Sequence, residues 1–241
     1  MTTEPGIWEE RQRILVVLAH PDDPEFFCGA TLARWAQAGH EITYFLLTCG
    51  DKGRNEHNHD VEAKELCALR HQEQHNAAAV LGVKEVHFLD LDDGYLVPDL
   101  ELRRKVVRAI RQFTPDILVT CDPQNLFPTY GINHPDHRAA GQAALDAVFP
   151  AAGNELFFPE LLDEDLPPHT PREVWVSLTS QPNVSLDVTD VWETKIRALQ
   201  EHKSQVGEPA KLEERMRSRH TPESTPEQPR YEEKFKVINW R

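Results

Sequence analysis

The amino-acid sequence predicts an α/β fold, a Rossmann-like three-layer α/β/α sandwich built on a mostly parallel sheet. Short apolar runs rich in β-branched residues alternate along the chain with longer stretches whose apolar residues recur every three or four positions. This alternation is typical of parallel strands joined by crossover helices. The chain of 241 residues is long enough to bury a sizeable core and has the length of one α/β domain. We therefore expect a single domain.

Strands and helices are expected to alternate over the first 150 residues. We predict strands at residues 14–19, 41–48, 85–90 and 117–122, and helices at residues 29–38, 61–81, 100–113 and 136–147. Prolines then interrupt the pattern before two strand-like runs, which we expect to form an edge extension or a small hairpin, at residues 173–178 and 183–189. A helix is predicted from Asp190, whose side chain suits the N-cap position, to about His202.

The C-terminal part of the chain has a different composition. Residues 208–229 are charged and Pro-rich, which is typical of a mobile surface loop or arm. The apolar run at residues 235–238 is expected to return to the body of the domain. We therefore assign residues 1–241 to one domain, with a core at about 14–205 and a partly mobile C-terminal arm at 206–241.

The chain is acidic, with 40 Asp and Glu residues against 26 Lys and Arg residues and a formal net charge of −14. Nucleic acid and anionic membranes bind clustered basic side chains, so neither is expected as a partner. The longest apolar run, residues 14–19, is far shorter than the roughly 20 residues that span a bilayer. The N-terminal segment has no basic stretch followed by an apolar run, so a cytoplasmic location is expected.

The four cysteines are Cys28, Cys49, Cys67 and Cys121, and no two of them form a CxxC pair. A thiolate zinc site or a disulfide framework is therefore not predicted, and we expect buried free thiols. The chain also has no GxGxxG motif after its first predicted strand, and no GxxxxGK[ST] or GxSxG motif. Nucleotide cofactors and a serine hydrolase mechanism are accordingly disfavoured.

Two polar clusters follow predicted strands. His20-Pro21-Asp22-Asp23 comes directly after the first strand, and His134-Pro135-Asp136-His137 lies between the fourth strand and the next helix. Function in such sheets collects at the carboxyl ends of the strands. Two imidazoles and a carboxylate with an open position describe a catalytic zinc site. The alternative is that the aspartates only cap the following helices and that the histidines are solvated, but the joint occurrence of the two clusters favours a functional site.

Two other histidine-rich segments are given no catalytic role. His71 and His75 have the i, i+4 spacing of helical zinc proteases, but Gln72 stands where those enzymes have Glu. The polar stretch at residues 55–60 is expected to be a solvated loop without groups that would orient metal ligands.

The sequence resembles the PIG-L/LmbE-like family of zinc-dependent de-N-acetylases, which act on N-acetylglucosamine-containing compounds. The similarity extends over most of residues 14–205. It is carried by Ala19-His20-Pro21-Asp22-Asp23 with Glu25, by Thr48-Cys49-Gly50-Asp51-Lys52-Gly53, by Arg70 and Glu73 ahead of Leu81-Gly82-Val83, by His134-Pro135-Asp136-His137, and by Lys195 with His202-Lys203-Ser204-Gln205.

The resemblance implies a role for each residue of the first cluster and for the last histidine of the second. His20, Asp23 and His137 would bind Zn²⁺, and Fe²⁺ suits the same donors. Asp22 would act as the general base. These are the catalytic and metal assignments that the family pattern implies.

The resemblance also implies roles around the metal. His134, oriented by Asp136, would be the second acid/base group or would stabilise the oxyanion. Arg70 would lie near the substrate with Glu73 as its structural partner, and their i, i+3 spacing on a helix permits that pairing. Some members have a Tyr two residues before the first His of the second motif, where this chain has Ile132; Tyr130 is out of register and is given no catalytic role.

The expected activity is metal-assisted hydrolysis of an N-acetyl group on a small GlcNAc-type molecule, releasing acetate and a free amine. The alternative is a catalytically inactive Rossmann-like domain that binds a ligand or a partner and uses its metal for structure. Asp22 and His134 are present in addition to three metal ligands, which favours the hydrolase. A homo-oligomer would fit the family, and the acyl group and the scaffold of the substrate are left open.

Overall fold

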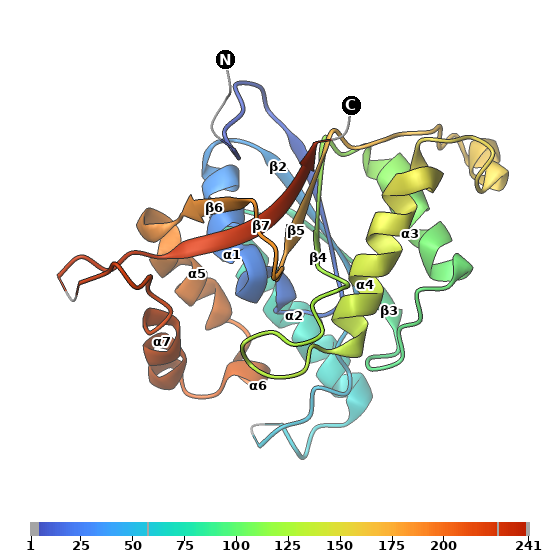
Figure 1. The fold of residues 1–241 in the computed structure, drawn as a ribbon. Helices are drawn as coiled ribbons and strands as arrows, with labels where there is room; N and C mark the ends of the chain where they lie inside the picture. Colours follow the sequence, from blue (N-terminus) through green and yellow to red (C-terminus); the bar gives the residue numbers. More distant parts are fainter. Residues whose placement is uncertain (1–4, 57, 226, 240–241) are drawn as a thin grey trace.

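The structure is a computed structural model, and it describes residues 5–56, 58–225 and 227–239 (Figure 1). Its centre is a seven-stranded sheet of order β3-β2-β1-β4-β5-β7-β6. The parallel part consists of β1 (Arg13–Leu18), β2 (Glu41–Thr48), β3 (Glu85–Leu91), β4 (Ile117–Cys121) and β5 (Glu173–Ser177). β7 (Glu232–Asn239) is antiparallel to both β5 and β6 (Val184–Asp187).

Helices cover both faces of this sheet, as Figure 1 shows. The helices are α1 (Asp23–Gln37), α2 (Ala63–Leu81), α3 (Leu100–Phe113), α4 (Pro135–Asp146), α5 (Trp192–Leu199), α6 (Lys203–Val206) and α7 (Pro209–Arg217). A π-helix at Ala147–Ala152 and 3-10 turns at Pro159–Glu164 and Thr189–Val191 complete the elements. The α/β sandwich that the sequence predicts is therefore confirmed.

The core consists of two layers, one on each face of the sheet. Val16 and Leu18 pack with α1, α2, α5 and α7, whereas Leu15 and Val17 pack with α3 and α4. All four of these side chains are fully buried, because β1 lies in the middle of a parallel sheet with helices on both faces. This double burial explains why the first strand is a continuous apolar run rather than an alternating one.

The structure decides between two alternatives and corrects one expectation for residues beyond 150. Of the edge extension and the small hairpin expected for residues 173–178 and 183–189, the edge extension is observed. The two runs do not pair with each other: β5 extends the parallel sheet beside β4, and β7 lies between β5 and β6. The last strand lies between them because residues 232–235 of β7 pair with β6 and residues 236–239 pair with β5. A hairpin cannot be told from this arrangement by local pattern, since both place two short strands close in sequence.

The segment predicted to be a loop at residues 208–229 contains the helix α7. Leu212 and Met216, one turn apart, are buried in the core layer of α1, α2 and α5. Their i, i+4 spacing is the amphipathic signal that the high charge of the segment concealed. The predicted helix from Asp190 begins later, at Trp192, because Asp190 lies in the preceding 3-10 turn.

Candidate active site

The loop from β1 to α1 has a backbone that presents two carboxylates in different directions. Asp22 has φ 84°, a left-handed conformation that is uncommon for a residue other than glycine, and its side chain makes no capping hydrogen bond to α1. Its backbone N–H donates to Gln74 Oε1 at 2.8 Å, which ties the loop to α2. The capping role considered for Asp22 is therefore absent, and a tertiary hydrogen bond holds this unusual backbone.

The Asp23 carboxylate lies between two imidazoles. Its Oδ1 is 3.0 Å from His137 Nε2, and its Oδ2 is 3.4 Å from His20 Nδ1. Oδ2 also accepts a hydrogen bond from the His20 backbone N–H at 2.8 Å. Burial would raise the pKa of Asp23, but the two histidines outweigh it and hold the pKa of this carboxyl well below its usual value.

The second cluster is positioned by the start of α4, which packs beside β4. His134 is the N-cap residue, and its Nδ1 accepts from the Asp136 backbone N–H at 3.2 Å. The Asp136 carboxylate does not cap α4; it accepts from the backbone N–H groups of Gly94 at 2.6 Å and Leu96 at 3.2 Å. The main-chain N–H of Asp136, rather than its carboxylate, thus contacts His134.

The proton positions of two histidines follow from their neighbours. Asn133 Nδ2 donates to the Asn125 carbonyl at 2.8 Å, which directs Asn133 Oδ1 toward His137 Nδ1 at 2.9 Å. His137 Nδ1 is then the donor, which leaves Nε2, facing the Asp23 carboxylate, as the ring nitrogen that can bind a metal ion. The 3.0 Å approach of Nε2 to Asp23 Oδ1 suits either a shared proton or a metal ion bound by both atoms.

The orientation of His20 is also set by its neighbours. Its Nε2 is 3.0 Å from Asp93 Oδ1 and 3.4 Å from Asp136 Oδ2, so Nε2 carries the proton and Nδ1 is turned toward Asp23. Carboxylates that accept from the outer nitrogen of a histidine commonly orient metal ligands in this way. His20 Nδ1, Asp23 and His137 Nε2 therefore fit a divalent metal ion with an N/N/O donor set.

Without a metal, the site would hold protons instead. Burial alone would lower the pKa of His20, but Asp23, Asp136 and Asp93 raise it well above the usual value. The pKa of His134 is lowered, by burial first and then by the two neighbouring histidines. The three imidazoles have ring nitrogens within 4.8 Å of one another, so the site is crowded with groups that compete for one cation.

Arg70 is buried beside the Asp22 carboxylate. Its guanidinium donates to Asp22 Oδ2 at 3.2 Å, to the Pro21 carbonyl at 2.7 Å and to the Gly50 carbonyl at 2.9 Å. A Cβ at Gly50, where φ is +68°, would lie 2.0 Å from Arg70 Nη1, so only glycine fits there. Burial raises the pKa of Asp22, and Arg70 opposes that increase. Arg70 also lines the cavity over the site, but its hydrogen bonds go to Asp22 and to the loops that contain Pro21 and Gly50.

The partner expected for Arg70 is engaged elsewhere. The Glu73 carboxylate accepts from the backbone N–H and the hydroxyl of Ser204, both at 2.7 Å. The pairing of Arg70 with Glu73 that the resemblance implied, and that the i, i+3 spacing permits, is therefore wrong. Glu73 instead fixes the turn that leads into α6, a contact across 131 residues that helix spacing cannot show.

Several residues of the site were not predicted from the sequence. Asp93 and Asn133 orient His20 and His137, and Asp93 follows β3, so it obeys the same rule that placed the first cluster at a strand end. Behind Asp22, Gln74 donates to both oxygens of the buried Glu25, which accepts from His202 Nε2 at 3.1 Å. This buried chain joins α1, α2 and the end of α5.

A cavity of about 840 Å³ opens above these groups. Its floor contains the site residues. Its walls carry aromatic side chains, the carboxylates of Glu232 and Glu233, and cationic side chains from α5, α7, the segment after α7, and β7. This volume suits a small molecule. The walls include Phe26, Phe27, Tyr130, Trp192, Lys195, Arg215, Arg219 and Lys234. Tyr130 Oη also donates to Asn133 Oδ1 at 3.1 Å, and Ile132 is exposed.

The two histidine-rich segments without a predicted catalytic role lie away from this cavity. His71 Nε2 is 2.8 Å from Asp90 Oδ1, and His75 contacts the ring of Phe88. In the stretch 55–60, His57 lies outside the described residues, and the side chain of Asn58 is buried and donates to the Ser204 carbonyl at 3.0 Å. The expectation of a purely solvated loop is therefore wrong at Asn58.

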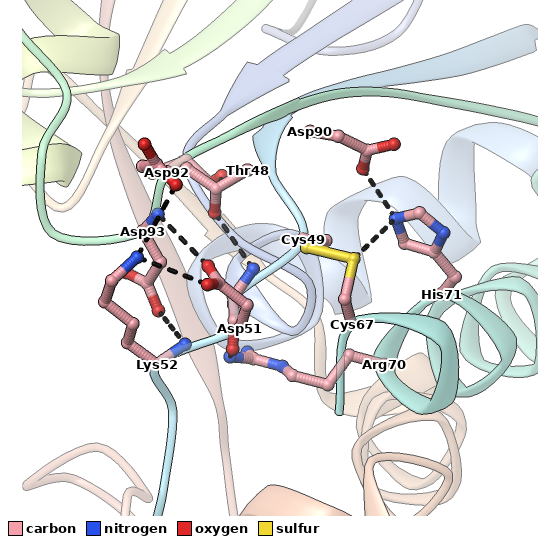
Figure 2. The surroundings of a disulfide bond; sticks show 12 residues. Thr48, Cys49, Asp51, Lys52, Cys67, Arg70, His71, Asp90, Asp92 and Asp93 are labelled. Carbon is pink, nitrogen blue, oxygen red and sulfur yellow. Dashed lines mark hydrogen bonds and ion pairs between the residues drawn. A yellow bond between two sulfur atoms is a disulfide. The ribbon is translucent and has the colours of Figure 1, made fainter. Parts of the chain in front are cut away.

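The expectation of buried free thiols is confirmed for Cys28 and Cys121 and is wrong for Cys49 and Cys67. Cys28 and Cys121 are buried free thiols, and burial raises the pKa of both. Cys49 and Cys67 form a disulfide between the end of β2 and α2 (Figure 2). The bond spans 18 residues, so only the packing of α2 against the strand end reveals it. Among the helices that the structure describes, none has the length and apolar character needed to cross a membrane.

The fold and the site together define the class of the protein: a Rossmann-like α/β domain with histidine and aspartate donors at the carboxyl edge of its sheet, beneath a cavity for a small molecule. Residues 15–148 match the model of the PIG-L family, described as GlcNAc-PI de-N-acetylase. The chain belongs to this family. It is 36% identical over 197 residues to a diacetylchitobiose deacetylase of Thermococcus kodakarensis, covering 82% of this chain and 71% of that protein.

Two further relatives show the range of the similarity. A probable N-acetyl-alpha-D-glucosaminyl L-malate deacetylase 2 of Bacillus anthracis is 28% identical over 200 residues, which cover 82% of this chain and 83% of that protein. Among solved structures, an N,N'-diacetylchitobiose deacetylase from Pyrococcus horikoshii, in complex with its inhibitor MPG, superposes with a TM-score of 0.87 at 27% identity. That superposition covers 99% of this chain and 88% of the other.

Proposed function

We propose that this protein is a metal-dependent deacetylase that hydrolyses the N-acetyl group of a small GlcNAc-containing molecule and releases acetate and a free amine. The observation that carries the proposal is the Asp23 carboxylate between His20 Nδ1, at 3.4 Å, and His137 Nε2, at 3.0 Å, a set of two imidazoles and one carboxylate that suits a divalent ion. His20, Asp23 and His137 would hold Zn²⁺, and Fe²⁺ is the alternative for the same donors. Relatives that are deacetylases of GlcNAc compounds support the reaction.

The residues around the donors divide the remaining chemistry between them. A bound divalent ion would polarise the amide carbonyl and lower the pKa of a coordinated water toward about 7. Asp22 is the base that accepts the proton of the attacking water, and Arg70 holds its carboxylate in place. The His134 ring contacts the His20 ring, with ring centroids 4.7 Å apart, and His134 is the group that donates a proton to the departing amine.

The cavity sets the class of substrate. Its volume of about 840 Å³ accommodates a sugar with a second group, and the aromatic side chains of its walls provide faces on which a sugar ring can stack. A small N-acetylated sugar is therefore the proposed substrate. A cytoplasmic location and a homo-oligomeric state stay predictions.

The test compares two adjacent carboxylates. Asp22→Asn is expected to keep its metal and to lose acetate release from N,N'-diacetylchitobiose by roughly 100-fold or more. Asp23→Asn is expected to lose both metal and activity, because it removes a ligand. Elemental analysis measures the metal, and acetate release measures the activity. Asp92→Asn, an exposed carboxylate next to Asp93, is the control and should change neither.

Two results would contradict the proposal. Full activity of Asp22→Asn would remove the base assignment. Stoichiometric metal in the wild-type protein, without acetate release from N-acetylglucosamine or its oligomers and with a large loss of stability on chelation, would favour the non-catalytic domain with a structural metal.

A further inference from the structure

A second group of metal-binding side chains lies outside the candidate active site, between the ends of β2 and β3 and the first turns of α2. Its members are Cys49, Cys67, His71 and Asp90, hereafter the thiol cluster. Their donor atoms all lie within 4.8 Å of one another. Figure 2 shows that the two sulfur atoms, the imidazole and the carboxylate face the same space.

The donors converge through a single nitrogen of His71. Nε2 is 2.8 Å from Asp90 Oδ1 and 3.9 Å from Cys67 Sγ, so the same ring atom faces both neighbours. The ring is stacked on Phe88 with centroids 3.9 Å apart, which fixes its orientation. Cys67 and His71 are one turn apart on α2 and therefore project from the same face of the helix.

We propose that the thiol cluster is a structural site for Zn²⁺ or a similar thiophilic divalent ion when the Cys49–Cys67 disulfide is reduced. Two thiolates, one imidazole and one carboxylate complete a four-coordinate set with no open position, which is the pattern of structural zinc. Thiolate ligands select Zn²⁺ over Mg²⁺ and Ca²⁺. The site differs from the candidate active site, which has no sulfur ligand.

Conversion of the disulfide form into the metal-bound form is a reduction followed by an exchange of protons for the ion. A dithiol reductant supplies two electrons and two protons; the S–S bond of Cys49–Cys67 breaks, two thiols form and the reductant becomes a disulfide. The ion then replaces the two thiol protons, which pass to the solvent as two metal–sulfur bonds form. Metal and disulfide are therefore mutually exclusive.

The position of the cluster indicates what either link does. Cys49 immediately precedes Gly50, whose carbonyl accepts from Arg70, and Cys67 lies one turn before Arg70 on α2. The disulfide ties this loop to the helix, and an ion held by the same two sulfurs would keep the tie in the reduced protein. The segment that positions Arg70 would thus stay attached to α2 in both redox states.

Co²⁺ reports on this site without interference from the active site, because only thiolate ligands produce an intense sulfur-to-Co²⁺ charge-transfer band. The full-length protein is reduced with a phosphine, freed of reductant under argon and titrated with Co²⁺, beside an oxidised sample. The band is expected in the reduced wild-type protein and absent in the oxidised one. Elemental analysis after Zn²⁺ loading should show about one more ion per chain in the reduced sample.

Variants test the individual ligands. Cys67→Ser should abolish the band, and His71→Ala should weaken Co²⁺ binding by at least about tenfold, since even groups that only support a metal ligand contribute roughly that much. His75→Ala is the matched control, because His75 lies one turn further along α2 and also contacts Phe88; it should bind Co²⁺ like the wild type. Circular dichroism checks that each variant is folded.

Two results would overturn the inference. The first is a reduced wild-type protein with four titratable thiols in denaturant and no charge-transfer band with excess Co²⁺. The second is equal Co²⁺ affinity of His71→Ala and His75→Ala, which would reduce the cluster to a dithiol that binds metal without the imidazole. Loss of acetate release has no part in either result, so the inference can fail or succeed independently of the proposed function.

Discussion

A buried ion pair between α5 and β7 allows a quantitative prediction. Lys195 Nζ is 2.6 Å from Glu233 Oε1 and donates to the Phe26 carbonyl at 3.0 Å. Glu233 also accepts from the backbone N–H groups of Ala30 at 3.1 Å and Thr31 at 2.7 Å. Both charged side chains are almost fully buried, with 2% and 3% of their surface exposed. The pair thus joins three elements that are distant in sequence.

Lys195→Met retains most of the length of the side chain and removes its charge. Glu233 then keeps two N–H donors but loses its only described cationic partner, and a buried carboxylate without a cation costs about 3–5 kcal/mol. This is a large share of the roughly 5–15 kcal/mol that stabilises a typical domain. The double variant Lys195→Met/Glu233→Gln should recover part of the loss, because the second change removes the unpaired charge.

Urea unfolding followed by circular dichroism measures the free energy of unfolding of each variant. The control is Arg217→Met, which removes ion pairs to Glu193 at 2.6 Å and to Glu213 at 2.9 Å, all of whose side chains are about half exposed. Exposed pairs contribute about 0–1 kcal/mol, so this change should cost little. The reasoning would be refuted if Lys195→Met cost less than about 1 kcal/mol, or if both substitutions cost the same.

Two further predictions concern Arg70 and His202. Arg70→Lys should lower kcat by about 10- to 150-fold with little change in KM, because Arg70 positions Asp22 and a hydrogen bond to a charged group contributes about 1.5–3 kcal/mol. Steady-state acetate release measures both constants. A raised KM at unchanged kcat would instead mean that Arg70 binds the substrate. Burial opposes a charge on His202, but Glu25 outweighs it and raises the pKa of His202. The stability from this pair should therefore be complete below about pH 6.5, the unfolded value, and should be lost as the pH rises through the higher folded pKa. The difference in unfolding free energy between the wild type and His202→Gln, measured in urea across this range, should shrink with rising pH, and a constant difference would contradict the assignment.

The two motifs that carry the site were recognisable because of a simple property of parallel sheets. β1 and β4 are neighbours, so the loops at their carboxyl ends meet at one edge, and each loop carries its own run of histidine and aspartate. The expectation that the two motifs meet at one edge of the sheet is confirmed, since His20, Asp23, His134 and His137 line one cavity. The first four strands were also predictable, because each is a short run rich in aliphatic, β-branched or aromatic residues.

The orientation of these side chains depended on contacts that no local pattern reports. Asp93 holds His20, and Arg70 pairs with Asp22 rather than with Glu73; both contacts join segments far apart in the sequence. Asn133, by contrast, is a local partner, four residues before His137. The disulfide also depends on the tertiary structure, since its two cysteines are brought together only by the packing of α2. Such partners are selected by geometry in three dimensions, and the residue types involved are common everywhere along the chain.

The sequence by itself determined the fold class, the parallel strands and the two motifs, because hydrophobic periodicity and short-range chemistry are local properties of the chain. Only the tertiary structure decided the strand order, the helical state of residues 209–217, the partners of His20, and the convergence of the thiol cluster. These features depend on the simultaneous burial of segments far apart in sequence. Their energies come from desolvated pairs and packed faces that exist only once the whole chain is folded.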